Sequence, residues 1–208
     1  PERFDMEECS RNMLYMPDAS AAAEAQMFLE EKMAQMDSAG GLVECVIQGV
    51  PAGIGEPVFE KLDANLAKAI CSIGAVKGFE IGDGFEAAKT TGAFNNDAFC
   101  ISPHGRVGQR TNHAGSILGG ISDGSRFVLR AAFKPTPSIA QQQQTVTRGM
   151  EETDIAIKGR HDPIIVPRAV VVVEAMAALT TADLLLLSMT SRLDRIQEFF
   201  GVHNTEQL

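Results

Sequence analysis

The chain has 208 residues, of which 45% are hydrophobic, and a formal net charge of -9. This length and composition are enough for a substantial core, in one large domain or two small ones. The negative charge disfavours nucleic acid and anionic membranes as partners. An anionic ligand would therefore need a site where cations are concentrated against this background.

The cysteines predict a reduced protein. Cys9, Cys45, Cys71 and Cys100 lie 26 to 36 residues apart, with no Cys-x-x-Cys pair. This spacing argues against a zinc site or another metal site and favours free thiols in a cytoplasmic protein.

An apolar segment, residues 169–187, is interrupted by Glu174 and Asp183. Two such charges are costly in lipid, so we expect a buried helix and no membrane span. No signal peptide is visible, and the chain begins without an initiator methionine.

The first part of the chain predicts alternating helices and strands. An Ala-, Glu- and Met-rich helix opens at Asp18 and is expected to stop at Gly40-Gly41. A Gly- and Pro-containing loop covers residues 49–57. The predicted helices are residues 18–36 and 58–73, and the predicted strands are residues 42–48 and 76–81.

The second part begins with a long stretch rich in Gly, Asn and Asp, residues 82–125. We interpret this stretch as functional loops with short strands, because long structureless loops are uncommon in compact domains. A strand follows at 127–133, then an exposed low-complexity run at 141–144. A final helix, or a broken pair, covers 168–200, and no internal domain boundary is expected within residues 1–208.

A glycine pair after the first predicted strand is similar to a dinucleotide-binding turn. Gly53 and Gly55 precede a predicted helix, but Val58 occupies the place of the third glycine. A partial motif of this kind is weak, so a structural turn is the better interpretation. A nicotinamide-dependent oxidoreductase stays open as an alternative.

Two polar clusters lie in the long loop region. Residues 95–97 (Asn-Asn-Asp) and 112–115 (Asn-His-Ala-Gly) are typical of turns, because Asn and Asp tolerate left-handed backbone. Turn chemistry explains less well why Gly119-Gly120 follows so closely. Paired glycines expose backbone N–H groups that can approach a phosphate or a flat ring.

Two further motifs combine cations with polar groups. The first motif offers one positive charge and two hydroxyls on a turn stiffened by prolines, which suits a phosphate. It consists of residues 134–138, which are Lys134, Pro135, Thr136, Pro137 and Ser138. A plain strand exit is the alternative.

The second motif, Arg160-His161-Asp162-Pro163, precedes an apolar helix. It suits an anionic ligand, and its alternative is a helix-entry salt bridge from Asp162 to Arg160 or Arg168.

Read together, these segments resemble the chorismate synthase family, in its C-terminal portion, over roughly residues 9–190. The matching motifs are residues 40–89, beginning GGLVECVIQGVPAGIGEP, NND at 95–97, RTNHAGSILGGISDG at 110–124, FKPTPSI at 133–139 and KGRHDPIIVPRAVVVVEAM at 158–176.

The resemblance implies an α+β fold, a β-α-β sandwich with antiparallel sheets flanking a helical layer, incomplete in this chain. It implies a lyase of the shikimate pathway, in aromatic amino-acid biosynthesis, that removes phosphate from 5-enolpyruvylshikimate 3-phosphate by 1,4-anti elimination to give chorismate. The implied cofactor is reduced FMN, with NADPH only in bifunctional relatives, and the intact family member is usually a homotetramer.

The resemblance also assigns roles to residues. The family's FMN contacts fall on Gly74, Ala75, Gly119, Lys134, Pro135, Thr136, Pro137, Ser138 and Arg160. Asp162 is similar to the family's catalytic carboxylate near flavin N5, and Arg160 is also expected to touch substrate. His161 is expected to be a structural partner.

The sequence departs from the family pattern at several positions. Ser116 replaces a glycine, Phe94 a smaller residue, Pro137 a serine and Ile164 a smaller residue. The first three are expected to reshape flavin contacts.

The family's N-terminal Gly-Glu-Ser-His-Gly, Arg-Pro-Gly-His and Ser-Ala-Arg motifs are absent, and with them the two histidines regarded as its acid catalysts. We therefore expect the chain alone to be inactive, with a non-catalytic flavin- or phosphate-binding fragment as the alternative.

Overall fold

The computed structural model describes residues 5–101, 105, 107–159 and 161–201. The chain divides into two compact units, each assembled from three segments. Of the described residues, the first unit contains those within 5–43, 74–77 and 132–172, and the second contains those within 44–73, 78–131 and 173–201. Four of the five divisions fall inside strands or one long helix, and the fifth, between residues 73 and 74, falls in the turn before a strand.

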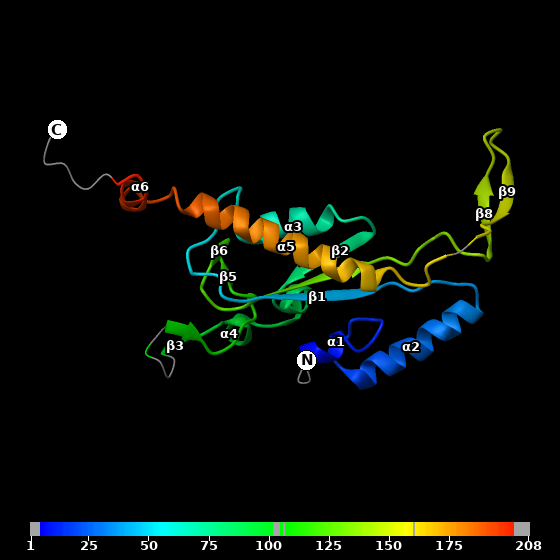
Figure 1. Cartoon of the computed structure of the whole chain (residues 1–208), viewed down its shortest axis with the longest axis horizontal. Coiled ribbons are helices and arrows are strands. Elements are labelled where there is room, and N and C mark those ends of the chain that lie inside the picture. Colours follow the sequence, from blue (N-terminus) through cyan, green and yellow to red (C-terminus); the bar gives the residue numbers. More distant parts are fainter. Residues whose placement is uncertain (1–4, 102–104, 106, 160, 202–208) are drawn as a thin grey trace, which may run out of the picture. The chain divides into compact units, whose positions relative to one another are not determined.

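Helices and strands are mixed throughout, which confirms the predicted α+β class (Figure 1). The helices are α1 (Met6–Cys9), α2 (Ala19–Ala34), α3 (Leu62–Cys71), α4 (Gly92–Asn95), α5 (Val166–Ser188) and α6 (Leu193–Phe199), with a 3-10 helix η1 (Gly84–Lys89). The strands are β1 (Gly41–Ile47), β2 (Val76–Ile81), β3 (Phe99–Ile101), β4 (Val107–Gln109), β5 (Ile117–Leu118), β6 (Ile121–Ser122), β7 (Phe127–Phe133), β8 (Gln142–Val146) and β9 (Glu152–Ala156).

The central sheet has the strand order β1-β7-β2. The Lys134 N–H donates to the Ala75 carbonyl at one end of the β2–β7 pair, and the Gly82 N–H donates to the Val128 carbonyl at the other. Since the two strands run in opposite directions between these bonds, β2 and β7 are antiparallel. Three separate antiparallel pairs complete the strands: β3–β4, β5–β6 and β8–β9.

Strand β7 and helix α3 carry much of the core. Alternate residues of β7 are buried, as expected for a strand with one face on the core. In α3 the residues Leu62, Leu66 and Ile70 are fully buried at a spacing of four, which places them on one helix face. The predicted strands 76–81 and 127–133 have these bounds in the structure, whereas α3 begins four residues later than predicted.

Helix α2 ends before the glycines that were expected to stop it. The Asp18 carboxylate accepts from the Ser20 and Ala21 N–H groups and caps the start. At the end, Met36 adopts a φ of 57°, its N–H donates to the Met33 carbonyl, and the Asp37 N–H donates to the Lys32 carbonyl. These are the two bonds of a Schellman motif, so the backbone reverses at Met36 and not at Gly40.

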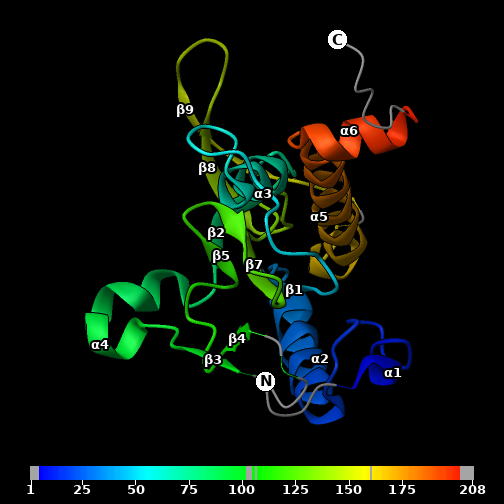
Figure 2. The same cartoon turned by 90° about the vertical axis from the view of Figure 1, so that its left-hand side faces the viewer.

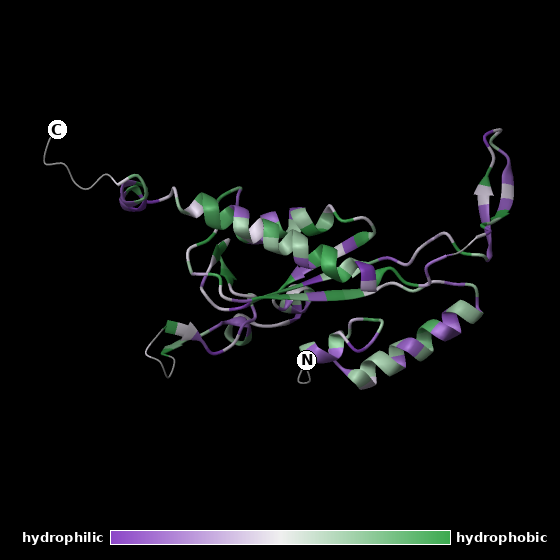
Figure 3. Ribbon diagram, in the orientation of Figure 1, coloured by the Kyte–Doolittle hydropathy of each residue, from purple (hydrophilic) through white to green (hydrophobic). Residues whose placement is uncertain are grey.

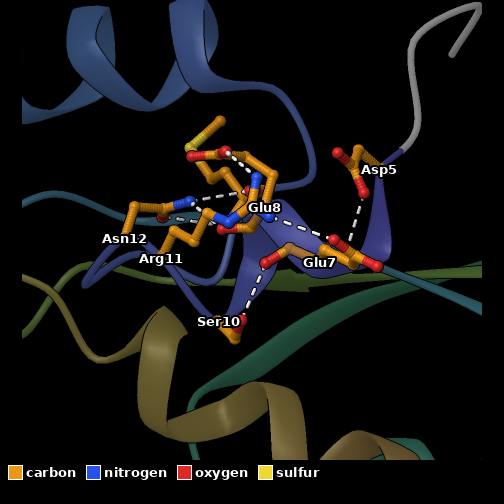
Figure 4. A network of polar contacts seen from close by, with 7 residues as sticks. Asp5, Glu7, Glu8, Ser10, Arg11 and Asn12 are labelled. Atoms are coloured by element: carbon orange, nitrogen blue, oxygen red, sulfur yellow. Dashed lines mark hydrogen bonds and ion pairs between the residues drawn. The ribbon is translucent and has the colours of Figure 1, made fainter.

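A network of local hydrogen bonds orders the N-terminal segment around α1 (Figure 4). Asp5 accepts from the Glu7 N–H, and the Ser10 hydroxyl donates to the Glu7 carbonyl. The Asn12 amide donates to the Glu8 and Met16 carbonyls. These side-chain hydrogen bonds thus stabilise the segment, because a helix as short as α1 is not stable by itself.

Helix α5 buries one stripe and leaves the opposite face open. The buried stripe consists of Ala169, Val173, Ala177, Thr181 and Leu184. Apolar residues also occupy the exposed face, and Figure 3 shows the hydrophobic colour over much of the side of the helix that faces the viewer.

Helix α5 is long and apolar enough to cross a membrane, and only 22% of its most apolar window is buried. The core helix of a soluble protein can pass the same test. The prediction of a buried helix is therefore wrong for most of its surface, because the pattern is apolar on all sides and only one side meets the core.

The β8–β9 hairpin is absent from the sequence predictions. Its glutamine-rich first strand alternates between exposed and half-buried, and all five residues of β9 are exposed. Without an apolar alternation the sequence offers no strand signal here.

The short elements of residues 84–122 belong to the second unit. Figure 2 shows α4 next to β3, and Figure 1 shows the same neighbours in a view turned by 90°. The prediction of loops with short strands in this stretch is confirmed.

Candidate functional site

The Lys134 turn, residues 134–138, leaves β7 directly beside the Gly74-Ala75 pair. The Lys134 N–H donates to the Ala75 carbonyl over 3.0 Å. Ala75 has a φ of 70°, which is uncommon for a residue with a side chain. The structure thereby brings together two groups of predicted contact residues that are distant in sequence.

Residues Ser38 to Gly40 support the same turn from α2. The Ser38 hydroxyl donates to the Thr136 carbonyl over 2.6 Å. A methyl group at Gly40 would lie 2.5 Å from the Phe133 carbonyl oxygen, so only glycine permits this approach. The sequence analysis assigned this segment no role at the site, although Gly40 begins one of the matching family motifs.

The same segment also holds the motif at the start of α5. The Ala39 N–H donates to the Pro163 carbonyl over 2.8 Å, and Ala39 forms a parallel bridge with Ile164. Residues 38–40 therefore contact the Lys134 turn and the Asp162-Pro163 motif at once. We call these three segments, with Gly74-Ala75, the Lys134 site.

The Lys134 site presents donors that the fold does not use. Within the described residues, the Lys134 ammonium and the Thr136 and Ser138 hydroxyls make no hydrogen bond, and Lys134 is exposed. A methyl group at Gly74 would meet no atom within 4 Å, which leaves open space there. A cation, two hydroxyls and an open backbone are a donor set that fits a phosphate-bearing cofactor such as FMN.

Asp162 forms an ion pair at the entry to α5. Its Oδ2 lies 2.8 Å from Nη1 of Arg168, and the two side chains are 37% and 74% exposed. The alternative interpretation of this motif, a helix-entry salt bridge, is therefore present in the structure. An exposed pair contributes about 1 kcal/mol at most, so it does not by itself explain the motif. The catalytic role of Asp162 stays a prediction.

Of the two residues that precede Asp162, the structure describes His161 and not Arg160. The His161 Nε2 lies 3.0 Å from the Ile157 carbonyl, which agrees with a structural partner. Arg160, predicted as a flavin contact, lies outside the described residues.

Gly119 lies in the second unit, at the turn of the β5–β6 hairpin. Gly119 and Gly120 have φ values of 61° and 89°, as a two-residue type I′ turn requires. The Gly120 carbonyl accepts from the Leu62 N–H at the start of α3. A methyl group at Gly119 would meet nothing within 4 Å, so its backbone is open to a ligand.

The Gly53–Gly55 segment is a structural turn. The Ser122 hydroxyl donates to the Pro51 carbonyl and accepts from the Ile54 N–H. The Gly55 α-carbon packs against the Gly120 carbonyl oxygen. Helix α3 does not start until Leu62, so this loop does not lead into a helix N-terminus as a dinucleotide-binding turn does.

Asp97 organises the loop that contains the Asn-His-Ala-Gly cluster. It accepts from the Thr111 hydroxyl over 2.6 Å and from the His113 and Ala114 N–H groups over 2.8 Å each. Burial raises the pKa of the Asp97 carboxyl, but these hydrogen bonds outweigh burial and hold that pKa below its ordinary value. The turn interpretation therefore describes this cluster well.

Two departures from the family pattern have local explanations. Ser116 is buried at a φ of 67°, and its hydroxyl donates to Asn112 Oδ1 and the Arg126 carbonyl. This serine is thus engaged within its own loop. Pro137 is exposed, and its carbonyl accepts from the Ile139 N–H and the Gln143 amide.

All four cysteines are free, as the sequence predicts. Burial, and next the charge of Glu174, raise the pKa of the Cys45 thiol to about 11. Within the described part of the chain no three His, Cys, Asp or Glu residues are grouped to hold a metal ion.

Comparison with known proteins places this geometry in a family. The sequence profile of chorismate synthase matches residues 4–186. The chain belongs to the chorismate synthase family. A chorismate synthase from Agathobacter rectalis is 62% identical over 95% of this chain, and one from Lachnospira eligens is 60% identical over 96%.

A solved chorismate synthase shares the fold. A crystal structure of a chorismate synthase superposes with a TM-score of 0.73 at 29% identity, covering 94% of this chain and 52% of that one. The Agathobacter rectalis and Lachnospira eligens relatives are covered over 53% and 54% of their length. The chain thus spans about half the length of the chorismate synthases it matches.

Proposed function

We propose that this chain provides part of the active site of a chorismate synthase. The proposed reaction removes phosphate from 5-enolpyruvylshikimate 3-phosphate by 1,4-anti elimination and gives chorismate. The observation that supports it is the Lys134 site, where residues 38–40 hold the Lys134 turn and the Asp162-Pro163 motif together. Family membership supplies the reaction class.

Reduced FMN is the proposed cofactor, and when bound it would supply the electron density that the elimination needs. Lys134, Thr136 and Ser138 would hold its phosphate or ribityl oxygens, since their donors are not used by the fold. Gly74 and Ala75 would allow close backbone approach. The chain's own contribution is to bind and orient, which removes translational and rotational freedom before reaction.

Asp162 is the proposed proton-handling carboxylate. Its ion pair with Arg168 orients the carboxylate at the start of α5. Arg168 is thus a positioning residue for Asp162 in this proposal.

The remaining parts of the active site are proposed to come from sequence that these 208 residues do not contain. The family's two acid histidines belong to motifs absent here. We expect the chain alone to bind flavin without turnover, and the intact enzyme to be a cytoplasmic homotetramer. NADPH would be used only in a bifunctional form.

The deciding experiment is anaerobic chorismate formation from 5-enolpyruvylshikimate 3-phosphate and prereduced FMN. The chain is assayed alone and after fusion to the N-terminal part of the Agathobacter rectalis relative. We expect product only from the fusion. Turnover by the chain alone would contradict the assignment of proton donors to the missing motifs.

Binding measurements on the chain alone separate the alternatives. FMN binding without turnover in either form would favour a non-catalytic flavin- or phosphate-binding protein. NAD(P)H binding in the absence of flavin would favour an oxidoreductase and contradict the proposal.

A further inference from the structure

A second polar arrangement, in the second unit, holds one imidazole at three points. The His113 N–H donates to Asp97, and the His113 carbonyl accepts from the Asp83 N–H over 2.8 Å. The His113 Nδ1 lies 2.6 Å from Oδ2 of Asp83. Backbone donor, backbone acceptor and ring nitrogen are therefore all engaged, and the ring has one orientation.

Two glycines make this arrangement possible. Gly82 and Gly115 have φ values of 57° and 67°, in the left-handed region that glycine favours. A methyl group on Gly115 would lie 2.5 Å from the Gly82 nitrogen, and one on Gly82 would overlap the His113 carbonyl oxygen. The segment after β2 and the loop before β5 can touch only because both residues lack a side chain.

The Asp83 contact determines which ring nitrogen is available. A carboxylate at Nδ1 favours the neutral tautomer with hydrogen on Nδ1, and leaves the Nε2 lone pair as the acceptor. After protonation, the same carboxylate stabilises the imidazolium, and Nε2–H becomes a donor. The His113 side chain is 17% exposed, and no described residue hydrogen-bonds Nε2.

We propose that His113, aimed by Asp83, is a ligand-contacting residue whose Nε2 donates a hydrogen bond and exchanges a proton with an anionic oxygen of the bound ligand. The inference rests on the proposed function, in which flavin and substrate both carry a phosphate. The proton passes from Nε2–H to the ligand oxygen, and His113 returns to the neutral Nδ1–H form.

The groups around the His113 ring include two carboxylates, whose negative charge is opposite to that of an imidazolium. Asp83 and Asp97 face His113 from the segments before η1 and β3, and the Phe94 ring lies 5.2 Å from the imidazole centroid. One residue before Asp83, the Gly82 carbonyl accepts from Arg130, which also pairs with Glu80. An imidazolium is thus balanced by nearby carboxylates when it forms.

A purely structural role is the competing explanation, because the pair also ties two loops together. The two roles differ in what happens at Nε2. A structural pair needs only Nδ1, so a ligand would leave the Nε2 resonance unchanged and the activity would not depend on ring protonation.

The first test uses the chain itself and nitrogen NMR of the His113 ring. We expect the Nδ1–H tautomer in the neutral state and a shift of the Nε2 signal on adding FMN or inorganic phosphate. Riboflavin, which lacks the phosphate, distinguishes a phosphate contact from a ring contact. An Nε2–H tautomer, or an Nε2 signal that none of these molecules moves, overturns the inference.

The second test uses the fusion with the N-terminal part of the Agathobacter rectalis relative. We expect His113→Gln to lower kcat about 100-fold with little change in KM, and to remove one limb of the pH profile. Imidazole in the buffer should partly restore His113→Ala. Thr111→Val, which removes one donor to Asp97 and leaves the ring intact, is the control.

The outcomes separate this inference from the proposed function. Unchanged kcat in His113→Gln, or equal damage in Thr111→Val, overturns the role of His113 while chorismate formation stands. An inactive fusion whose Nε2 signal still moves with phosphate contradicts the proposed reaction and retains His113 as a ligand contact.

Discussion

The Lys134 site and the loop of residues 97–115, in which Asp97 binds Thr111, His113 and Ala114 (the Asp97–His113 loop), are held together in opposite ways. At the Lys134 site the hydrogen bonds that join the segments end on backbone carbonyls, while the Lys134, Thr136 and Ser138 side chains have no hydrogen-bond partner among the described residues. In the Asp97–His113 loop the side chains bond to one another and to the backbone. Changes of side chain should therefore alter binding but not stability at the first region, whereas at the second they should alter stability as well.

The largest effect on stability is expected from a substitution of Asp97 in the Asp97–His113 loop. Asp97→Ala leaves the Thr111 hydroxyl and the His113 and Ala114 N–H groups without their acceptor. We expect a loss of about 3 kcal/mol in the free energy of unfolding, measured by denaturant titration. Asp154→Ala, in the exposed β9 strand, is the control and should change stability by less than about 0.5 kcal/mol.

The same carboxylate has a pH signature. Because the pKa of Asp97 is lower in the folded protein than its ordinary 3.8, its contribution is complete above that value and is lost as pH falls through the folded pKa. The difference in stability between wild type and Asp97→Asn should therefore shrink in strong acid. A constant difference down to the acid transition would contradict the assigned hydrogen bonds.

A backbone change at the Lys134 site comes next. Gly40→Ala places a methyl group 2.5 Å from the Phe133 carbonyl oxygen, whereas Gly74→Ala meets nothing within 4 Å. We expect Gly40→Ala to cost about 2 kcal/mol of stability through overpacking, and Gly74→Ala to leave stability near wild type. Equal melting temperatures for the two variants would show that residues 38–40 are not packed as described.

A side-chain change at the Lys134 site should act on the ligand alone. Lys134→Ala removes an exposed ammonium with no partner among the described residues, so the melting temperature should not change. FMN affinity should fall about 10- to 100-fold, as for loss of one charge-assisted contact. Lys68→Ala, an exposed lysine of α3, is the control in the same fluorescence titration.

The smallest effect concerns Cys45, away from both regions. Its pKa of about 11 exceeds the ordinary 9.0, so the folded state is favoured below pH 9 and loses this contribution as pH rises toward 11. The loss at pH 10 should be about 1 kcal/mol. Iodoacetamide at pH 8 should modify the exposed Cys71 before Cys45, and the reverse order would contradict the burial of Cys45.

Local patterns explain what the sequence predicts well. Strands β2 and β7 have the expected bounds because alternation in β7 follows burial directly. The start of α3 was placed too early because residues 56–60 form a turn closed by a bridge between Glu56 and Glu60, which no local pattern reveals. The hairpin β8–β9 lacks apolar alternation, and the open face of α5 looks like its buried stripe in sequence.

The candidate site was predictable in its parts and not in its assembly. The family motifs identify Gly74, Lys134 and Asp162, but of the joining segment, Ser38 to Gly40, they include only the glycine and assign it no role at the site. Its contacts to Thr136 and Pro163 depend on where the Met36 reversal sends the chain. The Asp83–His113 pair also joins distant segments, through a glycine contact that only the folded chain reveals.

The β8–β9 hairpin offers a natural reporter position. Its tip, residues 147–151, makes its hydrogen bonds within the tip itself as far as the structure describes the chain, and Met150 is 92% exposed. A methyl group at Gly149 would meet only the Thr147 hydroxyl, at 3.5 Å. A fluorophore or an inserted epitope at this tip would therefore leave the paired strands intact. Since the Gln143 amide ties the base of the hairpin to the Pro137 carbonyl, such a probe would sense ordering of the Lys134 turn without touching it.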